Sequence, residues 1–117
     1  MLTPNLTLTV RRPSTRLAVI DVAGDVTAAA EAAFAEAFTR ASSPGIETVA
    51  LSFVGLEYMN SSGIGLLVAL LIRANRQKQR LLACGLSDHY REIFNLTRLD
   101  DAIRIFDGEA DVLSAAA

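Results

Sequence analysis

The chain has 117 residues, of which 51% are hydrophobic and 21% charged, with a formal net charge of −2. This length and composition predict one compact domain with a sizeable apolar core, and they argue against intrinsic disorder. The small net charge gives no reason to expect nucleic-acid binding. The single cysteine, Cys84, cannot form an internal disulfide, which is compatible with a reducing compartment.

The sequence shows no targeting signal and no membrane-spanning segment. Residues Met1–Asn5 lack the basic and apolar regions of a secretory signal. The longest unbroken apolar run after them, Leu66–Ile72, is far shorter than the ~18 residues that indicate a membrane span. We therefore expect a soluble, cytoplasmic protein.

The first part of the chain predicts a hairpin followed by a helix. Residues 6–11 alternate apolar and polar side chains, which is typical of a half-buried strand, and residues 17–22 form a second, more buried strand. Residues 12–15 read as the turn between them, so the two strands should pair as a hairpin. Thr27 is well placed to cap a helix that runs to about Arg40.

The rest of the chain alternates strands with helices. The predicted strands are 48–54, 81–84 and 103–106, and the predicted helices are 64–79, 88–96 and 109–114. In helix 88–96, the buried face is expected to comprise Tyr90, Ile93, Phe94 and Leu96. The resulting order β-β-α-β-α-β-α-β-α predicts a single α/β domain over residues 5–115. Its five-stranded sheet should be mixed, mainly parallel and covered by about four helices.

Residues 58–65, Tyr-Met-Asn-Ser-Ser-Gly-Ile-Gly, stand where a predicted strand turns into a helix. The first turn of a helix leaves backbone N–H groups unpaired and carries partial positive charge, so an anion is favoured there. Ser61 and Ser62 have three possible uses at this point: a helix cap, a nucleophile or a phosphate acceptor. The cap is the ordinary use, and it contributes about 1 kcal/mol of stability.

Enzymatic chemistry has little support in the sequence. The only histidine, His89, stands at the start of a predicted surface helix, and Asn60 occupies the position where a hydrolase nucleophile elbow has glycine. Residues 63–65 lack the further residues of a dinucleotide fingerprint or a phosphate-binding loop, and no Cys/His cluster has metal-ligand spacing. We therefore expect a protein that is not an enzyme, with no catalytic residue, cofactor or metal.

A phosphoryl group on one of these serines is chemically compatible with the fold. It would add about −1.5 to −2 charge beside the N–H donors of the helix start, so it should not unfold the domain. Its effect would fall on a partner docked over the helix start, through charge repulsion and steric bulk.

Residues 51–65 resemble the strand and following D-S-S-G-[LIV]-G motif of the STAS domain family of bacterial anti-sigma factor antagonists. Residues 22–27 are similar to the family's G-[DE]-[LV]-[DT] link between the second strand and the first helix. Residues 86–99 are similar to its third helix and the loop after it. The resemblance covers nearly the whole chain, and the predicted order of elements is also the family's order.

The resemblance implies a partner-switching regulator of transcription. In such a system the unphosphorylated domain binds an anti-sigma factor that is also a serine kinase, and this frees a sigma factor. The kinase then phosphorylates the serine before the glycine, here Ser62, and the complex separates; Ser61 would supply a neighbouring hydroxyl. ATP and Mg²⁺ would belong to the kinase, and the domain itself would be a monomer or weak dimer.

The expected partner-binding surface combines the serine turn with neighbouring elements. The loop that follows the second strand should lie at the same end of the sheet as the serine turn. Helix 64–79 has more apolar residues than one buried stripe needs, so Leu67 or Leu71 is expected to be exposed for docking. The candidate residues are Gly24, Asp25, Thr27, Asn60, Ser61, Ser62, Gly63 and Leu67.

Two residues depart from the family's pattern. Asn60 stands where the family usually has aspartate, and Ser52 stands where the preceding strand often has aspartate. Asparagine keeps the capping oxygen but removes the charge, which either weakens recognition by the kinase or removes repulsion against a phosphate on Ser62. The alternative function is therefore a non-phosphorylated STAS scaffold subunit of an ABC-type lipid transporter or of a larger signalling assembly.

Overall fold

The computed structural model describes residues 5–116, and within that range the elements follow the predicted order. The strands are β1 (Leu6–Arg11), β2 (Leu17–Val26), β3 (Thr48–Met59), β4 (Arg80–Cys84) and β5 (Arg104–Phe106). The helices are α1 (Glu31–Ala41), α2 (Ser61–Arg76), α3 (Asp88–Leu96) and α4 (Glu109–Ala116), with short 3-10 turns at Ala28–Ala30 and Leu99–Asp101.

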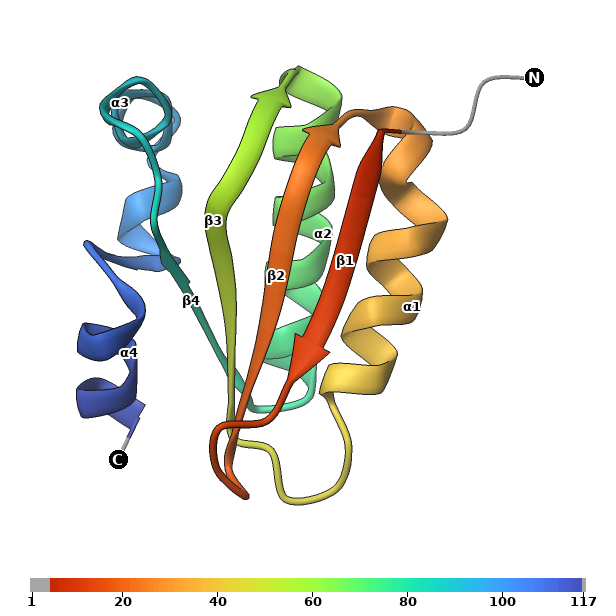
Figure 1. Cartoon of the computed structure of the whole chain (residues 1–117), viewed down its shortest axis with the longest axis vertical. Helices are drawn as coiled ribbons and strands as arrows, with labels where there is room; N and C mark the ends of the chain where they lie inside the picture. The colour runs from red at the N-terminus through yellow and green to blue at the C-terminus, as the bar shows by residue number, and fades with distance from the viewer. Residues whose placement is uncertain (1–4, 117) are drawn as a thin grey trace.

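The five strands form one sheet in the order β1-β2-β3-β4-β5. Strand β1 pairs antiparallel with β2, and the other three pairs are parallel (Figure 1). The predicted hairpin and the predicted mixed, mainly parallel α/β sheet are both confirmed.

Both faces of the central strands are buried, which explains why β2 and β4 show little alternation in sequence. The larger core lies between the sheet and helices α1, α2 and α3, where Phe34, Phe38 and Phe94 are fully enclosed. A smaller core lies under α4 and includes Val112 and Cys84. Burial raises the pKa of the Cys84 thiol, so this cysteine is a protonated core residue.

Strands β2 and β3 run further than the sequence predicted, to Val26 and Met59 rather than to residues 22 and 54. The β2–β3 register shifts between Asp21 and Ala23 and again beyond Gly24, so extra residues of β3 are accommodated while the two strands stay paired. Val54 in this stretch is 79% exposed. Gly55, Glu57 and Tyr58 are exposed as well, so the end of β3 shows no alternation of buried and exposed side chains.

The boundaries and the buried face of α2 also differ from the prediction. The helix spans Ser61–Arg76 rather than residues 64–79. Leu67 was expected to be exposed, but it is completely buried in the core, and the exposed aliphatic residues are Val68 and Ile72. Leu67 follows Gly63 by one turn, and both lie on the buried side of the helix. On α3, Leu96 was expected on the buried face but is exposed.

An ion network fastens α4 to the first hairpin. Arg11 lies 2.5 Å from a carboxylate oxygen of Asp21 and 2.5 Å from one of Glu109. The hydrogen bonds to Asp21 and Glu109 raise the pKa of Arg11, and the hydrogen bond from Arg11 lowers the pKa of Glu109. The network therefore ties the C-terminal helix to β1 and β2 through charge as well as through packing.

Replacing Glu109 by glutamine is expected to lower the free energy of unfolding at neutral pH by no more than about 1 kcal/mol, because both partners are a third or more exposed. The pKa of Glu109 is lower in the folded protein than in the unfolded chain. The ion pair therefore adds to the free energy of unfolding above the unfolded pKa, and this stabilisation is lost as the pH falls through the folded pKa. Urea unfolding of the wild-type and variant proteins over a series from neutral pH down to about pH 2 checks this, because the difference should shrink as the pH falls. A difference that persists in acid would show that the loss comes from packing.

None of the helices described between residues 5 and 116 has the combination of length and hydrophobicity that a membrane span requires. The prediction that Met1–Asn5 form no secretory signal concerns residues that, except for Asn5, lie outside the described range.

Candidate functional site

Asn60 is the single residue between β3 and α2, and it caps the helix. Its side-chain oxygen accepts a hydrogen bond of 3.0 Å from the N–H of Gly63, and its own N–H donates to the carbonyl of Val26 at 3.3 Å. One residue thus joins β2, β3 and α2. The interpretation that Ser61 or Ser62 caps the helix is wrong, because these are its first two residues.

Replacing Asn60 by alanine is expected to lower the free energy of unfolding by about 1 kcal/mol, because the Gly63 N–H loses its acceptor. Replacement by aspartate should at least preserve stability, since aspartate keeps the acceptor and adds negative charge at the positive end of the helix. Urea unfolding of the two variants measures the difference. An aspartate variant as unstable as the alanine variant would contradict the capping role.

Ser61 and Ser62 are both exposed at the start of a 16-residue helix. Among residues 5–116, no hydrogen bond involves either hydroxyl, and the backbone N–H groups of both serines lie in the first turn, where the helix offers no acceptor. A phosphoryl group on Ser62 would therefore meet unpaired N–H donors and the positive end of the helix dipole.

The two glycines of the motif lie in different surroundings. A Cβ on Gly63 would come within 2.3 Å of the Val26 carbonyl oxygen and 2.8 Å of the Met59 side chain. A Cβ on Gly65 would meet nothing within 4 Å. Gly63 is thus required for α2 to pack against the ends of β2 and β3. Gly65 keeps the surface one turn beyond Ser61 and Ser62 free of side chains.

The predicted neighbouring loop does lie at the same end of the sheet as Ser62, since Gly63 packs on Val26. Gly24 has φ +108°, and a Cβ there would come within 2.1 Å of the Asn5 carbonyl, so the backbone itself requires glycine. The Asp25 N–H donates to that same carbonyl at 2.7 Å. Thr27 caps the 3-10 turn before α1, accepting from the N–H of Ala29 at 3.4 Å.

Tyr90 brings a third element to this end of the molecule. Its hydroxyl accepts a hydrogen bond of 2.9 Å from the N–H of Met59, so the first turn of α3 is tied to the last residue of β3. The sequence indicated only that Tyr90 lies on the buried face of its helix. Nothing in an amphipathic pattern could have indicated this backbone partner.

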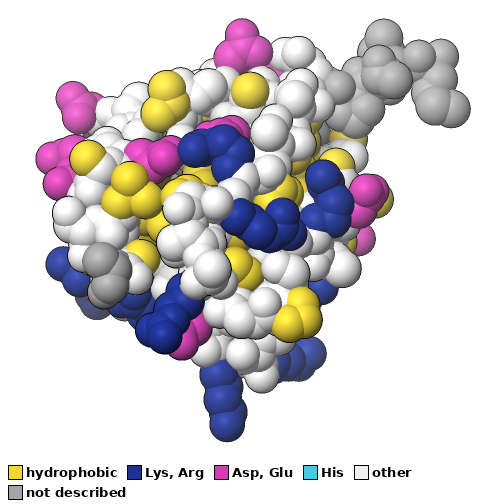
Figure 2. Space-filling view, turned by 60° about the horizontal axis from the view of Figure 1, so that its bottom comes forward, with side chains coloured by type: hydrophobic (Ala, Val, Ile, Leu, Met, Phe, Trp, Pro, Cys, Tyr) yellow, Lys and Arg dark blue, Asp and Glu magenta, His cyan; other side chains and the backbone are white. Residues whose placement is uncertain are grey.

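Charge is distributed unequally between the two ends of the sheet. The end that carries Ser62 has three acids, Asp25 and Glu57 near the ends of β2 and β3 and Asp88 at the start of α3, and the side-chain amide of Asn5 donates to Glu57 at 3.1 Å. Basic side chains gather at the opposite end, where strands β2, β3 and β4 begin (Figure 2). These are Arg12, Arg16, Arg40, Arg76, Lys78 and Arg80. A protein that binds the serine end should therefore present positive charge to it.

Two of the residues considered in the sequence do not belong to the site. Leu67 lies in the core beneath α2, and Ser52 lies in the middle of the sheet, paired with Asp21 on one side and Cys84 on the other. An aspartate at position 52 would be buried close to Asp21, so serine suits the site electrostatically. The structure brings together Asp25, Thr27 and residues 60–63.

The family model for the STAS domain matches residues 8–112, and the chain belongs to this family. The anti-sigma-B factor antagonist of Staphylococcus aureus is 29% identical over 73 residues, which cover 62% of this chain and 68% of that protein.

Solved structures share the fold at low sequence identity. An anti-sigma factor antagonist from Mycobacterium paratuberculosis has a TM-score of 0.81 at 18% identity, covering 95% of this chain and 93% of that one. Unphosphorylated SpoIIAA has a TM-score of 0.71 at 20% identity, covering 93% and 96%. The phosphorylated form of SpoIIAA from Bacillus has a TM-score of 0.66 at 18% identity, covering 93% and 99%.

Proposed function

We propose that this protein is an anti-sigma factor antagonist that acts by partner switching in the cytoplasm. Unphosphorylated, it binds an anti-sigma factor with serine kinase activity and thereby frees a sigma factor; phosphorylation of Ser62 then releases it. The relatives named anti-sigma-B factor antagonists support this role, as does the existence of SpoIIAA in both phosphorylation states. The role is regulatory rather than enzymatic, with ATP and Mg²⁺ held by the kinase.

The observation that carries the proposal is the exposure of both serine hydroxyls in the first turn of α2, neither with a hydrogen bond within residues 5–116; the place before the glycine in the family's motif selects Ser62. An accessible, unbonded hydroxyl can enter the active site of a kinase without local unfolding. Transfer forms a bond between the Ser62 oxygen and the γ-phosphorus and breaks the bond from that phosphorus to ADP, while the hydroxyl proton passes to a base of the kinase.

The charges around Ser62 suggest how binding and release are separated. Asp25, Glu57 and Asp88 form an acidic rim at the serine end. This rim attracts a basic surface on the kinase whether or not Ser62 is phosphorylated. Ser62 itself must face the nucleotide, so after transfer its phosphoryl group lies against the phosphates of ADP. Like charges held together in a closed interface are strongly unfavourable, and this repulsion drives the partners apart.

The test uses the purified protein with an anti-sigma factor kinase recovered from the same cells by affinity capture. With Mg-ATP, the intact mass should rise by about 80 Da, one phosphoryl group. Ser62→Ala should prevent the mass increase and leave a complex that does not separate. Ser61→Ala should show the same mass increase and the same separation as the wild-type protein. A stable complex without any mass increase would overturn the switch, and capture of an ABC-type ATPase instead would favour the scaffold function.

A further inference from the structure

The outer edge of β1 is an open strand edge. Strand β1 is the outermost strand and pairs only with β2 (Figure 1). The Asn5 carbonyl accepts a hydrogen bond from the N–H of Asp25, so Asn5 and Asp25 form a hydrogen-bonded pair. Because such pairs alternate along an antiparallel strand, the odd-numbered residues of β1 bond to β2. The N–H and C=O groups of Leu6, Leu8 and Val10 therefore point outward. Within residues 5–116, no hydrogen bond from outside the sheet reaches these groups.

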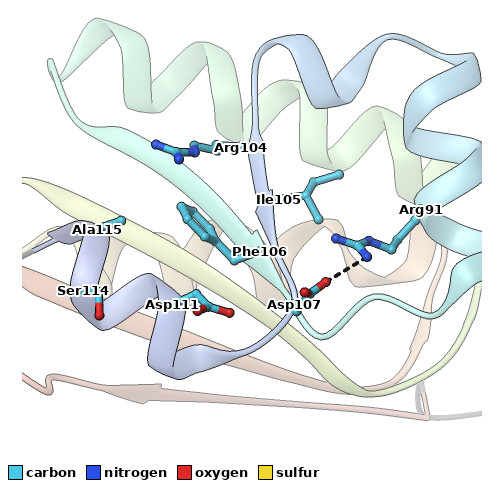
Figure 3. A pocket seen from close by; sticks show the side chains of 8 residues that line it. All are labelled: Arg91, Arg104, Ile105, Phe106, Asp107, Asp111, Ser114 and Ala115. Atoms are coloured by element: carbon cyan, nitrogen blue, oxygen red, sulfur yellow. Dashed lines mark ion pairs between the residues drawn. The ribbon is translucent and has the colours of Figure 1, made fainter.

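The opposite edge of the sheet is protected, as exposed edges usually are. Strand β5 has only three residues and carries the exposed Arg104. It lies in a trough between Arg91 of α3 on one side and Asp111 and Ser114 of α4 on the other (Figure 3). Short length, a charged side chain and flanking helices all hinder the addition of another strand. Residues 6–10 of β1 contain no charge, proline or glycine, so β1 lacks these protections.

We propose that β1 is a self-association edge to which a second copy of this chain adds its own β1, antiparallel, about a two-fold axis at Leu8. In this register Leu8 faces the partner's Leu8, and Leu6 faces the partner's Val10. These are all hydrogen-bonded positions, so every outward N–H and C=O of residues 6, 8 and 10 gains a partner. The two sheets join into one continuous sheet.

The side chains of β1 match themselves under this two-fold axis. Thr7 faces the partner's Thr9 on the face of the sheet that carries α4, and cross-strand threonine pairs are favourable. At the ends of the pairing, Arg11 lies beside the partner's Asn5, and its charge is already matched by Asp21 and Glu109. No like charges meet along the strand, so a second copy is the occupant that this edge fits.

Helix α1 also permits a second copy to approach. It packs over β1, and its exposed positions, counted with the preceding 3-10 turn, combine the alanines Ala29, Ala32 and Ala33 with longer side chains that include the ion pair of Glu36 and Arg40. Small side chains allow two helices to approach closely above a continuous sheet. The antiparallel arrangement sends the two Ser62 ends in opposite directions, so the dimer presents two free serine sites. This inference does not depend on the proposed function.

The test uses Thr7 and Thr9, which are both exposed. In the proposed dimer, Thr7 of each copy faces Thr9 of the other copy. Thr7→Lys with Thr9→Lys places like charges opposite each other twice and should raise the dimer Kd at least about tenfold. The matched control, Thr7→Glu with Thr9→Lys, places opposite charges together and should restore the wild-type Kd or improve it. Sedimentation velocity over a concentration series up to about 1 mM gives the three constants, and circular dichroism confirms that each variant is folded.

Hydrogen exchange locates the interface independently. Raising the concentration should slow exchange of the Leu6, Leu8 and Val10 amides and leave the Arg104 and Phe106 amides unchanged. A protein that stays monomeric up to about 1 mM would overturn the proposal. So would a double-lysine variant that dimerises as well as wild type, or protection confined to β5.

Discussion

Replacing Gly63 by alanine is expected to destabilise the domain by about 3 kcal/mol and to lower its melting temperature by on the order of 10 °C. The added methyl group would lie 2.3 Å from the Val26 carbonyl oxygen, and that oxygen is held in place because it also accepts the N–H of Asn60. Relief therefore requires α2 to move away from β2, which would disturb the cap and the core beneath it.

The same substitution at Gly65 is the matched control, because it adds one methyl group to the same helix within one turn. Gly65 is exposed with nothing within 4 Å of the added Cβ, so alanine should stabilise the protein by about 0.5–1 kcal/mol through helix propensity. Thermal unfolding of the two variants should thus give shifts of opposite sign. If both shifts were negative and similar, the close contact with Val26 would not be the reason for glycine at position 63.

Gly65→Ala has a second expected effect if the helix start meets a partner. Glycine in an exposed helix position is unfavourable by itself, and the isolated domain gives it no packing role. The methyl group would lie one turn beyond Ser61 and Ser62, where a docked kinase would approach. We therefore expect a more stable protein with weaker partner affinity, measured by titration calorimetry with the anti-sigma factor.

The order of elements could be predicted from sequence because each element carries its own local signal. The alternation of residues 6–11 corresponds to β1, whereas Thr27 caps the short 3-10 turn that precedes α1, and the N-cap of α1 itself is Ala30. The ends of β2 and β3 could not be predicted, because their final residues pair across register shifts on a partly uncovered sheet. At the end of β3 the contrast between buried and exposed side chains is lost, whereas in β2 the burial still alternates but Gly24 and Asp25 interrupt the apolar pattern of the sequence.

The place of the serine turn between a strand and a helix was predictable, but its internal arrangement was not. Three consecutive residues, Asn60, Ser61 and Ser62, are all good helix caps, and only the observed bond to Gly63 distinguishes them. The exposed side of α2 could not be predicted for a similar reason. A helix with apolar residues on most sides has no rotation that its sequence specifies, and the contact between Gly63 and Val26 sets the rotation that buries Leu67.

Phosphorylation of Ser62 is expected to lower affinity for the ADP-bound kinase at least about 100-fold while changing the melting temperature by only a few degrees. Stability should change little because the phosphoryl group stays in solvent beside the unpaired N–H groups of the first turn. Affinity should fall because the same group, closed into an interface against nucleotide phosphates, is a charge without a counter-charge.

Calorimetric titration of the phosphorylated and unphosphorylated proteins measures the affinity change, and scanning calorimetry measures stability. Asn60→Asp serves as the companion variant, since it adds charge beside Ser62 without adding bulk and keeps the cap. If repulsion dominates release, Asn60→Asp should weaken binding in the same direction as the phosphate but by a smaller factor. An unchanged affinity for Asn60→Asp together with full release on phosphorylation would assign the switch to steric bulk. If phosphorylation leaves the affinity unchanged, Ser62 is not the switch.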